Sequence, residues 1–541
     1  MKVRVLVIGI LLCLYFNSGL SQDWIKIYGG SLNTVVNSVF EHYDKGLILS
    51  GMQYDNTYHP NAWIQKTDVN GSVLWQKYYG IPQKYCNFFR SGKTEDNGII
   101  SIGMTDLLQS NCKDPIIVKS NYCGEKEWCR IYNAPGCNAV GQDIGVTKDG
   151  YMALINGWTS VEQQIIWLFR LDSIGDVIWA QVYATDPAWN SEWSYSLLQT
   201  TDSCFVITGE TYYPDPTYPT LKIIKIFLTK TNLNGEVIFE VPWGTNNGIY
   251  SDGRLSTMDS KRNIYTAGRR ARKSPPYGDS PTLFKTSKSG EPVFYQDLKT
   301  TSTLGIATTV NWFQDSTLAF CAQWRESSSL DTTGVLKTDS LGNYLDQISF
   351  PENYGIYGSD ITYNNRLILG GSGYASGNLY GVAIKLTSDL EYDSIYTTPF
   401  TYDSLCPHPI VSDTIPLDDC EVVVVGIDDP IQHLEKTKLK VYPNPAGNTL
   451  SVEMPEYLVR CQESGGQDLN NVGIKATTYY HQWKSVRLDV FDLFGKLMYS
   501  QEIQGKTDKV ELNISTWSAG MYVVRIVFMN DVVGVVKFVK E

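Results

Sequence analysis

Histidine is scarce in this chain, and its scarcity limits the chemistry that the chain can perform. The 541 residues include five histidines, which are His42, His59, His408, His433 and His481. Histidine is the usual base beside a Ser or Cys nucleophile and a common zinc ligand, so nucleophilic catalysis and His-ligated metal sites are poorly supported. The sequence also lacks a Gly-x-Ser-x-Gly elbow, a P-loop and a His-Glu-x-x-His motif. We therefore predict no catalytic residue, no metal site and no cofactor.

Positive charge and long apolar runs are also in short supply. Lys and Arg total 45 against 57 Asp and Glu, a net charge of −12. Proteins that bind nucleic acid need clustered basic residues for the phosphates, so nucleic acid is not an expected partner. The one long apolar run, Val5 to Phe16, is too short for a transmembrane segment. It follows two basic residues and precedes small residues up to Ser21, so residues 1–21 are predicted to be a cleaved signal peptide.

Cysteine is present, but not in the spacing of a zinc site. Ten cysteines follow the predicted signal peptide, and no Cys-x-x-Cys pair occurs among them. An exported protein keeps its disulfides, so we expect disulfides or buried thiols rather than zinc. Cys406 and Cys420 are a plausible pair. The connectivity of the cluster between Cys86 and Cys137 does not follow from spacing.

A repeat of about fifty residues fills most of the chain. Its first part is a short apolar strand, which recurs at residues 46–51, 98–103, 150–154, 204–209, 263–268, 317–321 and 366–370. Its second part is a hairpin whose turn carries Gly71, Gly124, Gly175, Gly235, Gly290 and Gly342, with Asp389 in the seventh copy. Glycine suits a turn that needs a positive φ, and a nearby Asp or Asn caps it. A calcium loop is the alternative, but it needs six or more oxygen ligands.

This repeat length predicts an all-β fold, with residues 22–396 forming a β-propeller of about seven blades. The mature N-terminus, residues 23–30, matches residues 74–80 of the first repeat. We expect this segment to supply an outer strand that completes the seventh blade and closes the ring. A row of β-sandwiches is the alternative, although separate sandwiches need nearer a hundred residues each.

The repeat stops after Tyr396. Residues 397–436 are rich in Pro, Asp, Ser and Thr and are predicted to be a linker with one short ordered piece. Short alternating strands then predict a small Ig-like β-sandwich at residues 437–541. This C-terminal region carries ordered motif residues, which are Tyr442, Pro443, Asn444, Pro445, Gly495, Gly520, Tyr522 and Lys537.

Those motifs closely resemble the type A C-terminal sorting domain of the type IX secretion system, which Bacteroidota use. An insertion at residues 456–485 departs from the compact spacing of that family. The resemblance implies export through the Sec pathway and the outer membrane, with the secretion machinery and its sorting peptidase as partners. It also implies release from the cell or attachment to surface lipopolysaccharide. We therefore expect a secreted or cell-surface protein.

Aromatic residues near the fourth repeat are the candidate ligand-binding site. They are Tyr212, Tyr213 and Tyr218, with Trp189 and Trp193 just before that repeat. Exposed rings stack on sugars or anchor a protein partner, whereas a proline-stiffened loop often buries its own rings. The sequence favours a binding or adhesion module for a glycan or a protein. A structural surface component is a further possibility.

Two groups of charged residues support alternative functions. A carbohydrate-active enzyme would need paired carboxylates, and Asp143 and Asp360 lie near predicted innermost strands where they could face the central channel. Solvated channel carboxylates are the expected reading of these two acids. The basic run from Arg269 to Lys273 could contact anionic surface polymers, although a solvated basic loop is the expected reading of such a run.

Overall fold

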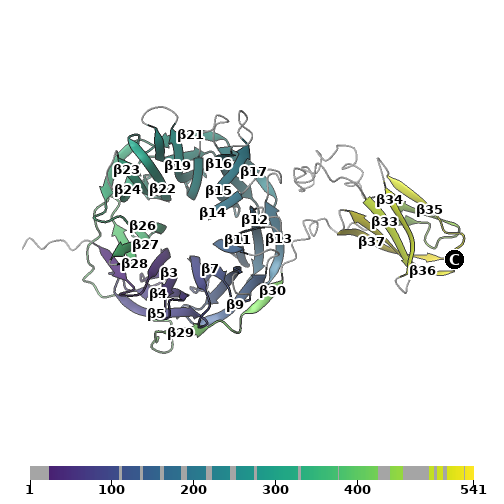
Figure 1. Ribbon diagram of the computed structural model, residues 1–541, viewed down its shortest axis with the longest axis horizontal. Helices are drawn as coiled ribbons and strands as arrows, with labels where there is room; N and C mark the ends of the chain where they lie inside the picture. Colours follow the sequence, from purple (N-terminus) through teal and green to yellow (C-terminus); the bar gives the residue numbers. More distant parts are fainter. Residues whose placement is uncertain are drawn as a thin grey trace, which may run out of the picture.

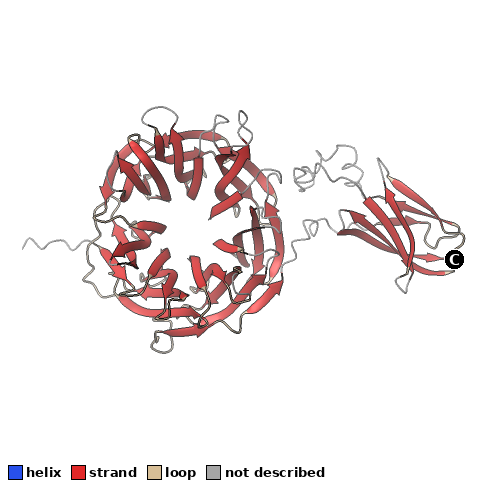
Figure 2. Cartoon of the chain, in the orientation of Figure 1, coloured by secondary structure: helices blue, strands red, loops and turns tan. Residues whose placement is uncertain are grey.

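Every regular element that the structure describes is a β-strand (Figure 2). The structure is a computed structural model. It describes residues 24–108, 112–133, 138–158, 164–183, 192–214, 222–243, 251–272, 277–326, 331–375, 377–424, 439–454, 486–492, 496–503, 508–528 and 531–541. The all-β prediction is confirmed. Within these ranges no helix is long and apolar enough to cross a lipid bilayer.

Strands β1 to β28 form seven antiparallel sheets among the described residues, and these sheets stand around a ring (Figure 1). We call them blades 1 to 7. Blades 1 to 3 contain β2 (Thr34–Glu41), β3 (Leu47–Tyr54), β4 (Pro60–Thr67) and β5 (Val73–Gly80); β6 (Cys86–Lys93), β7 (Ile99–Thr105), β8 (Asp114–Ser120) and β9 (Lys126–Asn133); and β10 (Val140–Thr147), β11 (Gly150–Trp158), β12 (Gln164–Asp172) and β13 (Val177–Tyr183). Blades 4 and 5 contain β14 (Glu192–Gln199), β15 (Phe205–Pro214), β16 (Lys222–Thr231) and β17 (Val237–Trp243); and β18 (Ser251–Met258), β19 (Ile264–Arg272), β20 (Gly278–Thr286) and β21 (Pro292–Asp297). Blade 6 contains β22 (Ser302–Trp312), β23 (Leu318–Glu326), β24 (Thr332–Thr338) and β25 (Tyr344–Ser349).

Blade 7 joins the two ends of the ring. It contains β26 (Gly355–Ile361), β27 (Leu367–Ala375) and β28 (Asn378–Leu386), and its fourth strand is β1 (Ile25–Tyr28) from the other end of the propeller sequence. β1 pairs antiparallel with β28, from Ile25 opposite Ile384 to Tyr28 opposite Gly381. The expected closing strand is therefore confirmed, and the ring is that of a β-propeller.

The repeated glycines lie in tight turns, as expected. Gly71 has a φ of +83°, which an L side chain rarely adopts. The Asp68 carboxylate accepts hydrogen bonds from the N–H groups of Asn70 and Ser72 at 2.9 and 2.7 Å, so a side chain caps the turn. The seventh copy differs from the prediction. There Leu390, not Asp389, takes the positive φ of 60°, because the turn closes from the Leu390 N–H to the Thr387 carbonyl.

Residues 397–424, which we call the strap, hold two strands on the outside of the ring. β29 (Asp413–Pro416) pairs parallel with β5, and β30 (Glu421–Val424) pairs parallel with β9. Two disulfides join the strap to blade 2, Cys123–Cys406 and Cys129–Cys420. The expected Cys406–Cys420 pair is therefore wrong, because the strap runs along the outside of the ring and brings each cysteine to a partner in blade 2.

The C-terminal residues form a second, smaller β-fold. One sheet contains β31 (Lys440–Tyr442), β32 (Thr449–Glu453) and β35 (Lys509–Asn513); the other contains β34 (Leu497–Ile503), β33 (Val486–Asp492), β36 (Gly520–Phe528) and β37 (Asp531–Lys540). Alternate residues of both sheets, among them Leu450, Val452, Leu488 and Val490, are fully buried in a single core. The predicted Ig-like sandwich is confirmed.

Candidate functional site

The first strand of every blade is interrupted by a β-bulge. The register shifts fall between Val36 and Ser38, Phe88 and Arg90, Gly141 and Asp143, Ser194 and Ser196, Gly253 and Ser256, Ala307 and Thr309, and Ile356 and Gly358. A bulge inserts an unpaired residue and re-aims the side chains around it. The bulges therefore change the directions in which these innermost strands point their polar and aromatic side chains.

The two ends of the blades differ in their connections. Because the strands are antiparallel, the turns after the first and third strands lie at one end, which we call the turn face. The connections after the second and fourth strands lie at the other end, which we call the loop face. Five residues separate β2 from β3, whereas eight separate β13 from β14. Binding residues concentrate on such longer connections and on the strand ends beside them.

Aromatic side chains gather at the loop face between blades 3 and 5. The rings of Trp158, at the end of β11, and Trp193, near the start of β14, lie 5.2 Å apart between centroids. The Arg254 guanidinium of β18 lies 3.8 Å from the centroid of the Tyr195 ring. The Tyr212 hydroxyl of β15 donates to Glu210 at 3.4 Å. All four rings are half-buried, so each keeps part of its surface exposed.

Charged groups contact two of these rings, Tyr195 and Tyr212. The buried Asp252 carboxylate accepts from Arg254 at 3.1 Å and from Arg269 at 2.8 Å. Burial, and then the neighbouring Asp252 charge, raise the pKa of Glu210. We call Trp158, Trp193, Tyr195, Glu210, Tyr212 and Arg254 the loop-face cluster. It combines flat apolar rings with adjacent hydrogen-bond donors and acceptors, which is the chemistry that sugars and exposed peptide segments require.

The predicted binding residues are only partly within the described structure. Trp193 and Tyr212 belong to the loop-face cluster. Tyr213 continues β15, but its side chain lies outside the description, and Trp189 and Tyr218 lie outside the described residues altogether. Sequence reasoning missed Trp158, Tyr195 and Arg254. The sequence signal for Tyr195 and Arg254 is their shared position in the repeat, because both occupy the bulge of the first strand in successive repeats.

Most of the predicted basic loop is instead part of a strand, and acids neutralise two of its arginines. Arg269, Arg270 and Arg272 belong to β19. Arg269 pairs with Asp252, Arg270 pairs with Asp297, and Arg272 donates to the carbonyls of Lys299 and Ser302. The reading of this run as a solvated loop is therefore wrong, because its arginines lie on a strand, where acids pair with Arg269 and Arg270 and main-chain carbonyls accept from Arg272. Lys273 lies outside the described residues.

Asp143 and Asp360 are the candidate carboxylates. Each forms hydrogen bonds between two neighbouring blades, and the two pairs of blades are different. Asp143 accepts from the N–H of Ile144 and from that of Leu197 in blade 4, both at 2.8 Å. Asp360 accepts from the N–H of Ile361 at 2.8 Å and from that of Glu41 in blade 1. Each side chain thus satisfies an otherwise unpaired N–H on the first strand of the next blade. Burial raises the pKa of both carboxyls, that of Asp360 to about 6.

Cys129, Asp419 and Cys420 are the described residues that come close enough to suggest a metal site. The two sulfur atoms, however, are joined in a disulfide. A metal would require them as thiolates, so this group is not a metal site as it stands.

The C-terminal motif residues come together although they are distant in sequence. The Asn444 side chain accepts from the Val539 N–H at 3.0 Å and donates to the Lys537 carbonyl at 3.4 Å. Tyr522 is buried and stacks on Phe538 at 5.5 Å. Tyr442, Pro443 and Pro445 lie at or just after β31, and Gly520 opens β36, whereas Gly495 lies outside the described residues.

A sequence model of the family described as the secretion system C-terminal sorting domain matches residues 440–541. These residues are a type IX sorting domain. The sorting domain directs the chain to the type IX secretion machinery and thereby to the cell surface or the extracellular space. The propeller lies outside the matched region, so the match carries no information on what the propeller binds.

Comparisons with whole proteins add little about the propeller. No curated protein sequence matched the chain. The extracellular domain of a one-component system protein from B. thetaiotaomicron is 10% identical, with a TM-score of 0.38 over 95% of this chain and 57% of that one. This chain therefore spans little more than half of that domain's length.

Two lyases also have similar structures. A PL25 polysaccharide lyase, an ulvan lyase, is 8% identical over 68% of this chain and 96% of its own, with a TM-score of 0.45. Virginiamycin B lyase from Staphylococcus aureus is 9% identical over 66% and 98%, with a TM-score of 0.40. At these values neither lyase supports an activity or a ligand for this chain.

Proposed function

We propose that this chain is an exported binding protein whose propeller holds a glycan at the loop-face cluster. In this proposal residues 1–21 are removed as a signal peptide, residues 22–396 form the binding propeller, and the sorting peptidase of a Bacteroidota cell acts on the C-terminal region. Lipopolysaccharide is the proposed anchor where the protein stays on the cell surface.

The observation that carries the proposal is the grouping of half-buried rings beside polar side chains at one end of the ring. Trp158 and Trp193 offer an apolar face on which a sugar ring stacks. Glu210 and Arg254 lie beside the rings of Tyr212 and Tyr195, where they supply an acceptor and a donor for hydroxyl groups. A protein ligand is the second candidate, because aromatic and Arg side chains also anchor protein interfaces.

An enzyme with paired carboxylates has less support. Asp143 and Asp360 each accept main-chain hydrogen bonds that join two blades, and they belong to different joints of the ring. Removing either carboxylate would therefore disturb the ring, whatever its chemistry. The loop-face cluster contains no such pair of acids facing each other across an open space, because Asp252 is buried under Arg254 and Arg269.

A glycan array tests the proposal with the chain lacking only its signal peptide. We expect selective binding to a sugar class, and a Trp193→Ala, Tyr212→Ala double variant that binds about tenfold or more weakly, because each lost 1.4 kcal/mol is tenfold in affinity. Tyr344→Ala is the matched control, because Tyr344 is an exposed aromatic on blade 6, away from the cluster. If the double variant binds the glycan as tightly as the wild type does, the binding site does not lie in this cluster. A wild-type chain that binds no glycan would leave the protein ligand as the better hypothesis.

A further inference from the structure

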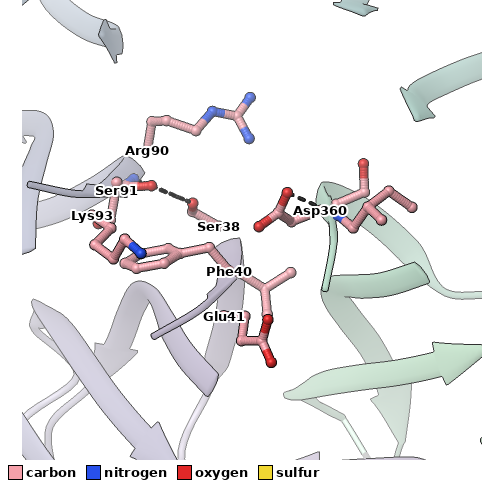
Figure 3. Close-up of a pocket in the computed structure, with 11 residues that line it drawn as sticks. Ser38, Phe40, Glu41, Arg90, Ser91, Lys93 and Asp360 are labelled. Atoms are coloured by element: carbon pink, nitrogen blue, oxygen red, sulfur yellow. Dashed lines mark hydrogen bonds between the residues drawn. The ribbon is translucent and has the colours of Figure 1, made fainter. Parts of the chain in front are cut away.

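A cavity of about 460 Å³ lies at the other end of the first strands, beside the turn face. Its walls come from the last residues of β26, β2 and β6, so it spans blades 7, 1 and 2 (Figure 3). Four charged side chains line it, Glu41, Arg90, Lys93 and Asp360. The loop-face cluster uses the opposite strand ends of other blades, so this cavity is independent of the proposed glycan site.

The acids and hydroxyls of the cavity already have hydrogen-bond partners. Glu41 accepts from the Tyr363 N–H at 2.7 Å. Asp360 accepts from the N–H groups of Ile361 and Glu41. The Ser38 hydroxyl donates to the Ser91 carbonyl and accepts from the Ser91 N–H, both at 3.2 Å. The hydrogen bonds of these groups connect the three blades, so these groups are not free to bind a ligand.

The two cations of the cavity, by contrast, form no hydrogen bond with any described residue, although Arg90 is ion-paired with Asp143. The Arg90 Nε atom is buried and donates no hydrogen bond there, but it forms an ion pair with an Asp143 carboxylate oxygen at 3.5 Å. That oxygen already accepts from the Ile144 N–H. Lys93 is exposed and forms no ion pair or hydrogen bond with any described residue. A buried donor without an acceptor is costly, so an acceptor supplied by a ligand would stabilise this site.

We propose that this cavity binds an oxyanion between the Arg90 guanidinium and the Lys93 ammonium. A carboxylate, sulfate or phosphate group provides several acceptor oxygens, and Arg offers them a planar fork of N–H donors. Figure 3 shows the Arg90 side chain extending above Ser38, and Lys93 lying beside the Phe40 ring below Ser91. Arg90 and Lys93 lie three residues apart on β6.

Acidic pH should strengthen the binding. Burial raises the pKa of Asp360 to about 6 and also raises that of Glu41, while Lys93 favours the ionised form of both. Asp143, whose pKa burial also raises, is the remaining acid beside Arg90. Below pH 6 Asp360 becomes neutral, so the cavity carries less negative charge and attracts an anion more strongly.

Isothermal titration calorimetry tests the site in the chain that lacks only its signal peptide. The probes are sodium sulfate and inorganic phosphate as free anions, and glucuronate as a sugar-borne carboxylate. We expect saturable binding of at least one probe, at least tenfold weaker in Arg90→Gln and in Lys93→Met. Lys288→Met is the matched control, because Lys288 is an exposed lysine on a turn of blade 5. Preference for glucuronate would identify an acidic sugar as the source of the anion, and preference for sulfate or phosphate would identify the free anion.

Two results would overturn the proposal. One is a wild-type chain that binds none of the three probes, and the other is Lys93→Met binding as tightly as Lys288→Met. Lys93 is exposed, so its variant should fold normally, and an unchanged melting temperature would verify this even if Arg90→Gln proves unstable. Affinity for the bound probe should also be higher at pH 5.5 than at pH 7.5 in the wild type.

Discussion

Single side chains join each blade to the next, and they explain why the sequence repeats Tyr and Gly at fixed places. The hydroxyl groups of Tyr28, Tyr79, Tyr132 and Tyr183 donate to the carbonyls of Gly71, Gly124, Gly175 and Gly235 at 2.7 to 3.0 Å. In each pair the Tyr is the last or next-to-last residue of the outer strand of one blade, and the Gly lies in a turn of the next blade. A hydrogen bond of this kind contributes about 1 kcal/mol, and the buried rings add apolar burial.

Asp360 gives a prediction at this scale. Because its pKa of about 6 in the folded chain exceeds the ordinary 3.8, the folded state keeps a proton that the unfolded state releases. The contribution of Asp360 to the free energy of unfolding should therefore fall as the pH rises from about 4 to about 6. Lys93→Met should raise the pKa further, because it removes a positive charge that favours the carboxylate.

Carboxyl ¹³C NMR, followed over pH 3 to 8, measures this pKa directly. Lys288→Met should leave the pKa where it is in the wild type, since Lys288 lies on a turn of another blade. A wild-type pKa near 4 would contradict the buried position of Asp360, and an unchanged pKa in Lys93→Met would contradict its proximity to Lys93.

At the scale of elements, the strap is the feature that distinguishes this propeller from a simple ring of repeats. It leaves blade 7, crosses the closing joint and adds parallel strands to the outer edges of blades 1 and 2. Lys77 pairs with Asp413 at 2.7 Å and Arg130 pairs with Glu421, so each added strand begins with a matched charge. Covering a strand edge in this way protects it from pairing with other chains.

Loss of the strap disulfides should destabilise the propeller. Each closes a loop of nearly three hundred residues, since the sequence separations are 283 and 291. We expect a Cys129→Ser, Cys420→Ser double variant to lower the free energy of unfolding by about 2–4 kcal/mol, measured by denaturant unfolding. Cys204→Ala is the control, because Cys204 forms no disulfide. A double variant no less stable than this control would show that the strand pairing alone holds the strap.

At the scale of the whole molecule, the propeller and the sorting domain are two separate folds. The propeller is closed by its own N-terminal strand, so its sheets do not need the C-terminal residues for pairing. The sorting domain has its own core and its own pair of sheets. Its first motif residues are hydrogen-bonded to its last strand, so the recognition motif exists only when this domain is folded.

Deletion of residues 440–541 should stop export without unfolding the propeller. We expect the truncated chain to accumulate in the periplasm of a host with a type IX system, because the machinery no longer recognises it. Cell fractionation with surface proteolysis measures this, and Tyr344→Ala, which leaves the sorting domain intact, is the control for expression and export. Normal surface levels of the truncated chain would refute the role of the sorting domain.

The local repeat was readable from sequence because its signals are local. Alternating apolar strands and turns with Gly71 or Gly175 depend on neighbours in the chain, as does the match between residues 23–30 and 74–80 that anticipated the pairing of β1 with β28. The ordered motif of the sorting domain was readable for the same reason. Where the local signal was weak, as at Asp389 and Leu390, the predicted turn residue was wrong by one position.

Contacts between distant residues were beyond the sequence. The Cys123–Cys406 disulfide and the meeting of Tyr195 with Arg254 join different repeats or segments, and their partners depend on how the blades pack around the ring. The pairing of Arg269 with Asp252 depends on the register of two adjacent strands in blade 5. The sequence by itself therefore determined the strands, their turns and the route of export. Only the tertiary structure decided which side chains share a site, because burial and charge pairing are set by neighbours that are far away along the chain.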